Sequence, residues 1–127
     1  MIKIHVAREG RCVHISSGNN CVSMTYEELK SLSQIEFIPT DLKSTSPWFT
    51  DIYIEERERL LEFLKQNSIG SRIVYPPIHS QKAYNLKKNF PVTEKYATSG
   101  LWLPSSMKLT DADIREICAA IRKFYGR

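Results

Sequence analysis

Two consecutive prolines in the middle of the chain restrict its fold more than any other feature. Pro76 and Pro77 follow Ile73, Val74 and Tyr75, which are β-branched and aromatic residues of the kind that favours a strand. Proline donates no N–H to a sheet, and it biases the preceding residue toward an extended conformation. The sequence therefore predicts a strand that ends at Tyr75, followed by a stiff, straight segment that leaves the sheet.

The residues after the prolines are the candidate ligand contacts. This segment would carry Ile78, His79, Ser80 and Gln81 to the rim of the sheet. An imidazole can offer a donor, an acceptor or a charge, so His79 could contact a sugar or a phosphate. The alternative is structural, with His79 capping the strand end or bonding to a backbone group. The pattern leaves both interpretations open.

Four other stretches carry the signals of helices. A capping box at Thr25 and Glu28 predicts a short helix with Leu29 and Leu32 facing inward. The other helices are expected over Glu55–Asn67, after an Asn89 cap with Pro91 in the first turn, and after a Thr110 cap. Gly70 is expected to take the left-handed conformation after the second helix.

Apolar spacing predicts which side of two helices is buried. In the second helix, Leu60, Leu61 and Leu64 form one stripe. In the last helix, the apolar residues recur every three or four positions, at Ile114, Ile117, Cys118, Ile121, Phe124 and Tyr125. Both helices are therefore expected to pack on a sheet through one face.

Strands are expected between these helices and ahead of them. Alternating residues predict a hairpin from Ile2–Val6 and Cys12–Ile15, followed by a polar loop over Ser16–Asn20. Further strands are expected at Gln34–Ile38, Trp48–Ile54 and Gly100–Pro104. The predicted fold class is α+β, with a small mostly antiparallel or mixed sheet covered by helices.

The strand over Trp48–Ile54 is apolar on both faces, which favours a central place in the sheet. Trp48, Thr50, Ile52 and Ile54 are expected on the core side, and Phe49, Asp51 and Tyr53 on the other. Trp102 is also expected in the core rather than as a stacking platform.

Composition argues against several classes of protein. The net charge is +4, and lysines and arginines are scattered among acidic residues, so no basic stripe for nucleic acid is present. Cys12, Cys21 and Cys118 are odd in number and widely spaced, which argues against disulfides and against a zinc site. No apolar run has the length of a membrane span or the form of a signal peptide, so a cytoplasmic, membrane-free protein is expected.

Five segments in a fixed order carry a resemblance to a known family. They are P-W-F-T-D-I-Y-I-E (Pro47–Glu55), N-S-I-G-S-R (Asn67–Arg72), Y-P-P-I-H-S-Q-K-A-Y (Tyr75–Tyr84), N-F-P-V-T-E-K (Asn89–Lys95) and the stretch Gly100–Ile114. Together they resemble the small C-terminal domain of the DegT/DnrJ/EryC1/StrS sugar aminotransferases. This family consists of fold-type I enzymes that use pyridoxal phosphate (PLP).

The resemblance covers roughly Thr25 to the end. Residues 1–24 are therefore expected to form a hairpin extension unlike the family, and residues 25–127 the aminotransferase-like domain. The extension could cap a sheet edge or derive from a truncated or rearranged gene. Because Met1 precedes the unlike stretch, a naturally short reading frame is the favoured interpretation.

The resemblance implies amino transfer, usually from glutamate, to a keto sugar on a nucleotide carrier. It implies that this domain forms one wall of the cleft, with His79, Gln81 and Tyr84 nearest the substrate and Arg72 available to a phosphate or carboxylate. Lys82 departs from the family, which often has proline there. The alternatives are an ordinary surface loop and a solvated arginine.

The catalytic machinery of the family is not expected in this chain. Transamination needs a lysine bonded to the cofactor, an acid against its pyridine nitrogen and a cradle for its phosphate. The family carries these in a large domain, so no catalytic or cofactor-binding residue is assigned and the chain alone is expected not to transaminate. The rival interpretation is a non-enzymatic module that binds a sugar nucleotide, pairs with a PLP-domain-bearing subunit, or forms a homo-oligomer through an exposed apolar surface.

Overall fold

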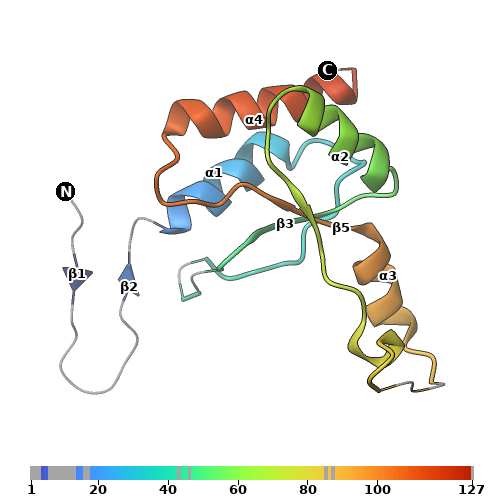
Figure 1. Cartoon of the computed structure of the whole chain (residues 1–127). Helices are drawn as coiled ribbons and strands as arrows, with labels where there is room; N and C mark the ends of the chain where they lie inside the picture. The colour runs from blue at the N-terminus through green and yellow to red at the C-terminus, as the bar shows by residue number, and fades with distance from the viewer. Residues whose placement is uncertain are drawn as a thin grey trace.

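The computed structural model describes residues 4–5, 14–15, 18–42, 44–45, 47–84, 86 and 88–126. Over these residues the fold is α+β, as predicted, with four helices and a small three-stranded antiparallel sheet (Figure 1). The helices are α1 (Gly18–Leu29), α2 (Arg57–Gln66), α3 (Pro91–Ser99) and α4 (Asp111–Phe124). A single 3₁₀ turn, η1, covers Ile78–Ser80.

The sheet consists of β3 (Thr50–Tyr53), β5 (Gly100–Leu103) and β4 (Arg72–Ile73), in the order β3-β5-β4. The central strand is therefore β5. The prediction that the Trp48–Ile54 strand is central is wrong, and the predicted Ile73–Tyr75 strand forms the opposite edge. The last strand is central because both others pair with it antiparallel, a long-range choice that apolarity alone does not reveal.

The expected strand over Gln34–Ile38 is reduced to one bridge. The Glu36 amide donates to the Tyr53 carbonyl at 2.8 Å, and the Tyr53 amide donates back at 3.0 Å. This bridge partly covers the outer edge of β3.

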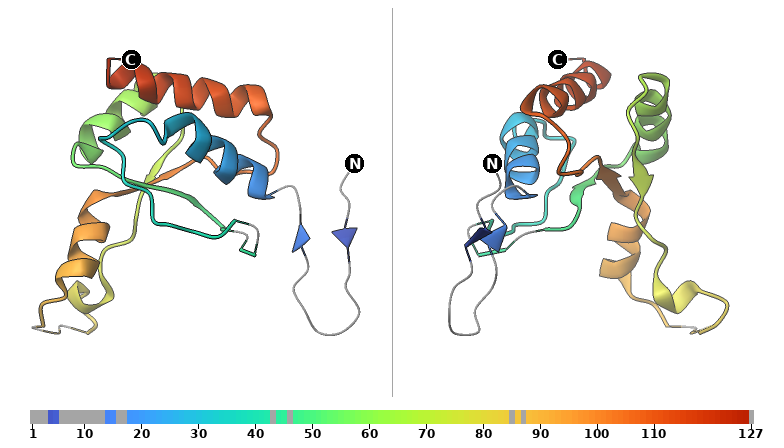
Figure 2. Two further views of the ribbon diagram at one scale, coloured as in Figure 1. Left: turned by 180° about the vertical axis from the view of Figure 1, so that it is seen from behind. Right: turned by 60° about the vertical axis from the view of Figure 1, so that its left-hand side comes forward.

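Three helices cover one face of the sheet. In Figure 2, α1 and α4 lie side by side, and α2 lies against the other end of α4. The face of β3 and β5 that they cover presents Thr50, Ile52, Leu101 and Leu103, all buried. On the helices, the predicted Leu60, Leu64, Ile114, Ile117, Cys118 and Ile121 are buried in the same core. Helical periodicity therefore identified most of this layer.

Helix α1 begins earlier than the capping box predicted. Gly18 opens the helix, so the predicted loop over Ser16–Asn20 is wrong in its last three residues, and Thr25 lies inside the helix rather than at its N-cap. Thr25 is buried beside Cys21 and Leu29, because residues four apart share one helix face. Leu29 and Leu32 are fully buried, as predicted. The helix runs across the predicted division between residues 24 and 25.

The helix ends confirm some caps and correct others. Thr110 caps α4 in a reciprocal capping box with Asp113, as predicted. Pro91 is the first residue of α3, but the N-cap is Phe90, whose amide donates to Glu94 Oε1 at 3.2 Å, rather than Asn89. After α2 the left-handed residue is Ser68, with φ of 60°, rather than Gly70.

The N-terminal hairpin is confirmed where the structure describes it. Strand β1 (Ile4–His5) pairs antiparallel with β2 (His14–Ile15), with Ile4 opposite Ile15. The turn predicted between them lies outside the described residues.

Candidate functional site

The segment after β4 extends away from the sheet, as the two prolines predict. Pro77 has φ −56° and ψ 137°, an extended conformation, and η1 follows it directly. Figure 1 shows this segment running down to η1, which lies beside α3. We call η1, α3 and the loop between them the arm.

His79 is held inside the arm. Its Nε2 lies 3.2 Å from Glu94 Oε1, and its ring contacts that of Phe90 at 4.8 Å between centroids. Only 12% of the side chain is exposed. The same Glu94 oxygen accepts the Phe90 amide, so the histidine and the start of α3 share one carboxylate. His79 thus joins η1 to α3 through a side chain, a contact that neither interpretation of the sequence anticipated.

Gln81 and Tyr84 lie on the exposed loop that follows η1. The Tyr84 amide donates to the Gln81 carbonyl at 3.0 Å, which closes a turn and leaves both side chains exposed. Their positions are compatible with ligand contact, but no cavity described here joins them to Arg72.

Arg72 lies on β4, and its guanidinium sits over the Tyr75 ring at 5.1 Å. It borders an open hollow of about 540 Å³ together with Arg57, Tyr75 and Pro77. Arg57 donates to the Ala97 carbonyl at 2.8 Å and pairs with Glu58, whereas no ion pair is formed to Arg72 by the described residues. Arg72 is therefore the available cation of this hollow.

An aromatic cluster lies on the sheet face opposite the helix layer. Trp102 stacks on Phe49, with centroids 4.1 Å apart and rings inclined by 11°. Tyr75 meets Trp102 edge-on at 4.9 Å. The expectation that Trp102 belongs to the core is therefore wrong, because alternation along β5 places it opposite the buried Leu101 and Leu103.

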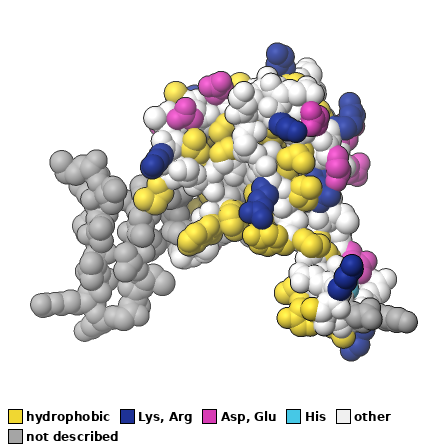
Figure 3. Space-filling model, in the orientation of Figure 1, with side chains coloured by type: hydrophobic (Ala, Val, Ile, Leu, Met, Phe, Trp, Pro, Cys, Tyr) yellow, Lys and Arg dark blue, Asp and Glu magenta, His cyan; other side chains and the backbone are white. Residues whose placement is uncertain are grey.

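Trp48 was also expected in the core, and it is 85% exposed. Regular pairing of β3 begins only at Thr50, so the alternation that buries Thr50, Ile52 and Ile54 does not extend back to Trp48. In Figure 3, hydrophobic side chains form a band along the lower edge of the main body, below the helices. The apolar side chains exposed in this part of the chain include Trp48, Phe49 and Tyr75.

A charged row crosses the same open face. Asp51 lies opposite Trp102 in the β3–β5 ladder, and Arg72 lies opposite Trp102 in the β4–β5 ladder. The three side chains are therefore cross-strand neighbours, with an acid on one side of the indole and a guanidinium on the other. The sign of this row in the sequence was Asp51, a charged residue in the middle of the mostly apolar stretch Trp48–Ile54.

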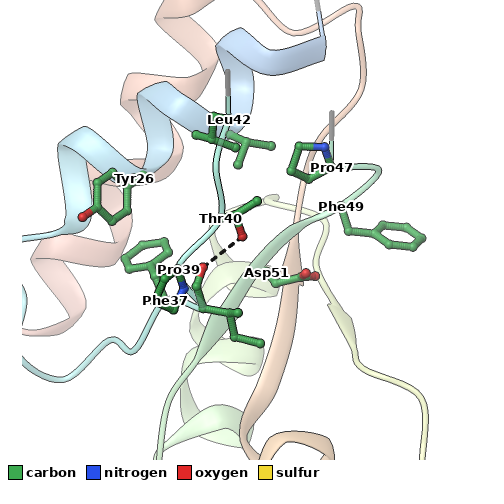
Figure 4. Close-up of a pocket in the computed structure, with 10 residues that line it drawn as sticks. Tyr26, Phe37, Pro39, Thr40, Leu42, Pro47, Phe49 and Asp51 are labelled. Atoms are coloured by element: carbon green, nitrogen blue, oxygen red, sulfur yellow. Dashed lines mark hydrogen bonds between the residues drawn. The ribbon is translucent and has the colours of Figure 1, made fainter. Parts of the chain in front are cut away.

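Asp51 also borders a cavity of about 350 Å³ between β3, α1 and the loop that precedes β3. Tyr26, Phe37, Pro47 and Phe49 contribute to its walls (Figure 4). The Asp51 Oδ1 atom is buried and has no hydrogen-bond partner among the described residues. Burial raises the pKa of Asp51, and a hydrogen bond from Trp102 offsets part of this effect. Sequence reasoning did not identify Asp51 as a candidate.

The described residues do not fit a PLP site. Lys95 bonds Glu36 at 2.8 Å, and this contact raises the pKa of Lys95, whereas a lysine that attacks a carbonyl needs a lowered pKa. Lys30 pairs with Glu27 in the same way. The other described lysines are exposed: Lys65, Lys82, Lys88, Lys108 and Lys123. No group of acidic, histidine and cysteine side chains in the described part of the chain could hold a metal ion.

The family is decided by a match that covers most of the chain. Residues 15–122 match the model of the DegT/DnrJ/EryC1/StrS aminotransferase family. The chain belongs to this family. The family is PLP-dependent, and the part of its fold that lies outside these residues is not in this sequence.

Two curated relatives are GDP-perosamine synthases. The chain is 33% identical over 89 residues to the enzyme of Vibrio cholerae. That match covers 64% of this chain and 24% of the relative. It is 30% identical over 116 residues to the enzyme of Escherichia coli O157:H7. That match covers 88% of this chain and 32% of the relative. The chain thus covers about a quarter to a third of these relatives.

Two solved aminotransferase structures share this fold over about a third of their own length. A DegT DnrJ EryC1 StrS aminotransferase from Brucella abortus matches with a TM-score of 0.74 and 28% identity, over 87% of this chain and 31% of that one. The aminotransferase TlmJ from Streptoalloteichus hindustanus matches with a TM-score of 0.79 at 18% identity, over 87% and 31%, and shows the fold alone. Within the described residues, no helix is long and apolar enough to cross a membrane.

Proposed function

We propose that this chain acts as the C-terminal domain of a PLP-dependent aminotransferase and helps to bind the substrate. That substrate is a keto sugar on a nucleotide carrier. The observation that carries the proposal is the family match over residues 15–122. The names of the two curated relatives favour a GDP-linked sugar among the possible carriers. In this role the chain contributes binding and shape, and a large domain contributes the cofactor and its lysine.

The chemistry of the exposed groups supports a role for this chain in substrate binding rather than in cofactor binding. Arg72 is a guanidinium without an ion-pair partner among the described residues, and such a group binds phosphate in a bidentate manner. Gln81 and Tyr84 offer an amide and a phenol on an exposed loop. His79, bonded to Glu94, acts as a positioning residue that fixes this loop against α3.

The rival proposal is a module that pairs with a separate subunit or with itself. The aromatic cluster of Phe49, Tyr75 and Trp102 favours it, because apolar surface of this kind commonly marks an interface. A large domain in the same polypeptide and a large domain on a partner would cover this face equally well. The two cases therefore differ in whether the large domain is covalently linked to this chain, and not in the groups that would meet at this face.

A segment replacement tests the enzyme proposal. The stretch of the Vibrio cholerae enzyme that matches this chain would be exchanged for the corresponding residues of this chain. We expect the chimera to transfer an amino group from glutamate to a GDP-linked keto sugar, measured by mass spectrometry of the sugar nucleotide. The control is the same enzyme with the matched stretch deleted, which should be inactive. A chimera that folds and binds PLP but transfers no amino group would contradict the proposal.

A mixing experiment tests the rival. This chain would be added in excess to the deleted enzyme, with no covalent link between them. Recovery of amino transfer would support pairing with a separate subunit, and its absence, beside an active chimera, would exclude that form of the rival.

A further inference from the structure

Trp48 is the most exposed of the large apolar side chains in the described part of the chain, at 85%. Its indole meets the ring of Phe49 at 6.5 Å between centroids, with the two rings inclined by 60°. The backbone at this position is held in place, because the Ser105 hydroxyl donates to the Trp48 carbonyl at 3.3 Å. The structure therefore presents a large flat side chain to the outside from a fixed point on the backbone.

The cavity in front of β3 has a suitable size and lining for such a side chain. Its volume is about 350 Å³, and Pro47 and Phe49, the two chain neighbours of Trp48, contribute to its mainly apolar walls (Figure 4). Tyr26 and Phe37 brace another part of the wall edge-to-face at 5.2 Å. An apolar cavity of about 150 Å³ is large enough for benzene, so this one has room for the two fused rings of an indole.

Apolar side chains also mark the opening of this cavity at the surface. Three residues of its lining, Tyr26, Ile38 and Phe49, are between 37% and 48% exposed. We call these three residues and Trp48 the tryptophan patch. Taking roughly 150–250 Å² for each side chain, the tryptophan patch exposes on the order of 400 Å². A standard interface buries about 800 Å² on each partner, and a little more than half of this area is apolar. The tryptophan patch therefore has about the apolar area of one side of a stable interface.

The projecting side chain and the cavity belong to the same chain and lie close together on it. Trp48 stands in sequence directly between two residues of the lining, Pro47 and Phe49. When a two-fold axis relates two copies, each contact between a projection and a recess occurs twice. Tryptophans that fill pockets are prominent among the residues that dominate binding energy at interfaces. We propose that two copies of this chain pair through the tryptophan patch, with Trp48 of each copy inserted into the cavity of the other.

This inference deepens the rival proposal, in which the chain pairs with itself. It adds a specific contact, a symmetry and a surface centred on Trp48 rather than on Trp102. It does not depend on the aminotransferase role, because it uses only the shape and the apolar area of this chain.

The association of the full 127-residue chain tests the proposal. Sedimentation equilibrium over about three decades of protein concentration measures the dimer, because mass action makes its population depend on concentration. Tryptophan emission is recorded on the same samples. We expect a concentration-dependent dimer, and a blue shift of the emission as Trp48 leaves water. A chain that stays monomeric with unchanged emission would overturn the proposal.

Trp48→Ala removes the projecting side chain and leaves the cavity open. We expect this variant to dimerise at least about thirtyfold more weakly than the parent, as is usual for a tryptophan that dominates an interface, and to lose the blue shift. Val92→Ala, at a position on α3 that is 68% exposed, is the matched control and should dimerise like the parent. Circular dichroism checks that both variants fold. A folded Trp48→Ala variant that dimerises like the parent would refute the proposal.

Thr40→Phe tests the cavity separately from Trp48. Thr40 is exposed and borders the cavity, so a larger side chain at this position should block the cavity without disturbing the core. We expect Thr40→Phe alone to lose the dimer. Its mixture with Trp48→Ala should form a one-to-one pair, because one copy keeps its tryptophan and the other keeps its cavity. A mixture that forms no such pair would contradict insertion of Trp48 into this cavity.

A small probe distinguishes a second copy from another occupant. N-acetyltryptophanamide carries the same indole, and we expect it to bind Trp48→Ala, to be excluded by Thr40→Phe and to dissociate the parent dimer. Binding of this probe by a parent chain that is monomeric at every concentration would assign the cavity to a tryptophan of a different protein. That result would overturn the pairing of two copies.

The outcome is separable from that of the segment replacement. An active chimera beside a monomeric parent chain would remove the pairing and leave the aminotransferase role standing. A dimer that depends on Trp48, with an inactive PLP-loaded chimera, would keep the pairing and remove the aminotransferase role.

Discussion

At the residue scale, two carboxylates, those of Glu94 and Asp51, have opposite effects on their surroundings. His79 and Glu94 tie the arm together, because one carboxylate serves both the imidazole and the first turn of α3. Asp51 does the opposite, since it keeps a buried oxygen without a partner. The Glu94 carboxylate therefore stabilises its surroundings, whereas burial of the Asp51 carboxylate costs free energy that a hydrogen bond from Trp102 offsets only in part.

The role of His79 is testable by truncation. We expect His79→Ala to speed amide hydrogen exchange at Phe90 and in the first turn of α3. It should also lower the free energy of unfolding by about 0.5–1.5 kcal/mol, the usual value for a hydrogen bond of this kind. Gln81→Ala, on the exposed loop nearby, is the control and should change neither. Unchanged exchange in His79→Ala would show that the Glu94 contact does not hold the arm.

Asp51 should make stability depend on pH. Burial raises its pKa in the folded state, so ionisation is disfavoured by folding, and the associated stability is present below the unfolded pKa and lost as pH rises through the folded pKa. Asp51→Asn cannot ionise. We expect it to be more stable than the parent at about pH 7 in urea titrations, with the difference shrinking toward about pH 4. A constant difference over this range would contradict the raised pKa.

At the element scale, the first residue of the central strand β5, Gly100, has no room for a side chain. A Cβ placed on Gly100 would lie 2.6 Å from Val74 Cγ2 and 2.8 Å from the Tyr96 carbonyl oxygen. One of these neighbours is backbone and cannot swing aside. Gly100 is therefore what allows β5 to follow α3 without a break, while β4 packs beside it.

We expect Gly100→Ala to destabilise the fold by about 1–3 kcal/mol, the usual cost of overpacking. Gly70→Ala is the matched control, because nothing lies within 4 Å of a Cβ at that site and its φ is not left-handed. That variant should be neutral or more stable by up to about 1 kcal/mol. Chemical denaturation of both variants measures the difference, and equal effects would count against the close approach.

At the scale of the whole molecule, the fold is a helix-covered sheet with one aromatic face that the described residues do not cover. The sequence match spans most of the chain but about a third or less of the curated relatives. The exposed groups that we propose as substrate contacts lie in this chain, and no described lysine has the surroundings of a cofactor lysine.

We therefore expect no specific PLP adduct on this chain. Incubation with PLP, borohydride reduction and intact-mass measurement should give low, distributed labelling over several exposed lysines. Lys95→Ala and Lys30→Ala should not change the pattern beyond the loss of one minor site. A single stoichiometric adduct on one lysine would mean that the chain holds a cofactor site of its own.

Local patterns in the sequence determined a large part of this structure. The stripes of α2 and α4, the Thr110 cap, Pro91 at the start of α3 and the extended exit at Pro76 and Pro77 follow from side-chain periodicity and backbone restriction within a few residues. The ordered segments between Pro47 and Ile114 also identified the family. These features are local, so propensity and spacing are enough to find them.

The tertiary structure decided which segments meet. Only long-range pairing makes β5 central, turns Trp102 to the open face, joins His79 to Glu94 and leaves Asp51 Oδ1 buried without a partner. The physical reason is that a sheet satisfies its hydrogen bonds and buries apolar area across strands distant in sequence. Several registers of the same strands would satisfy the local pattern equally well, and the global packing selects one of them.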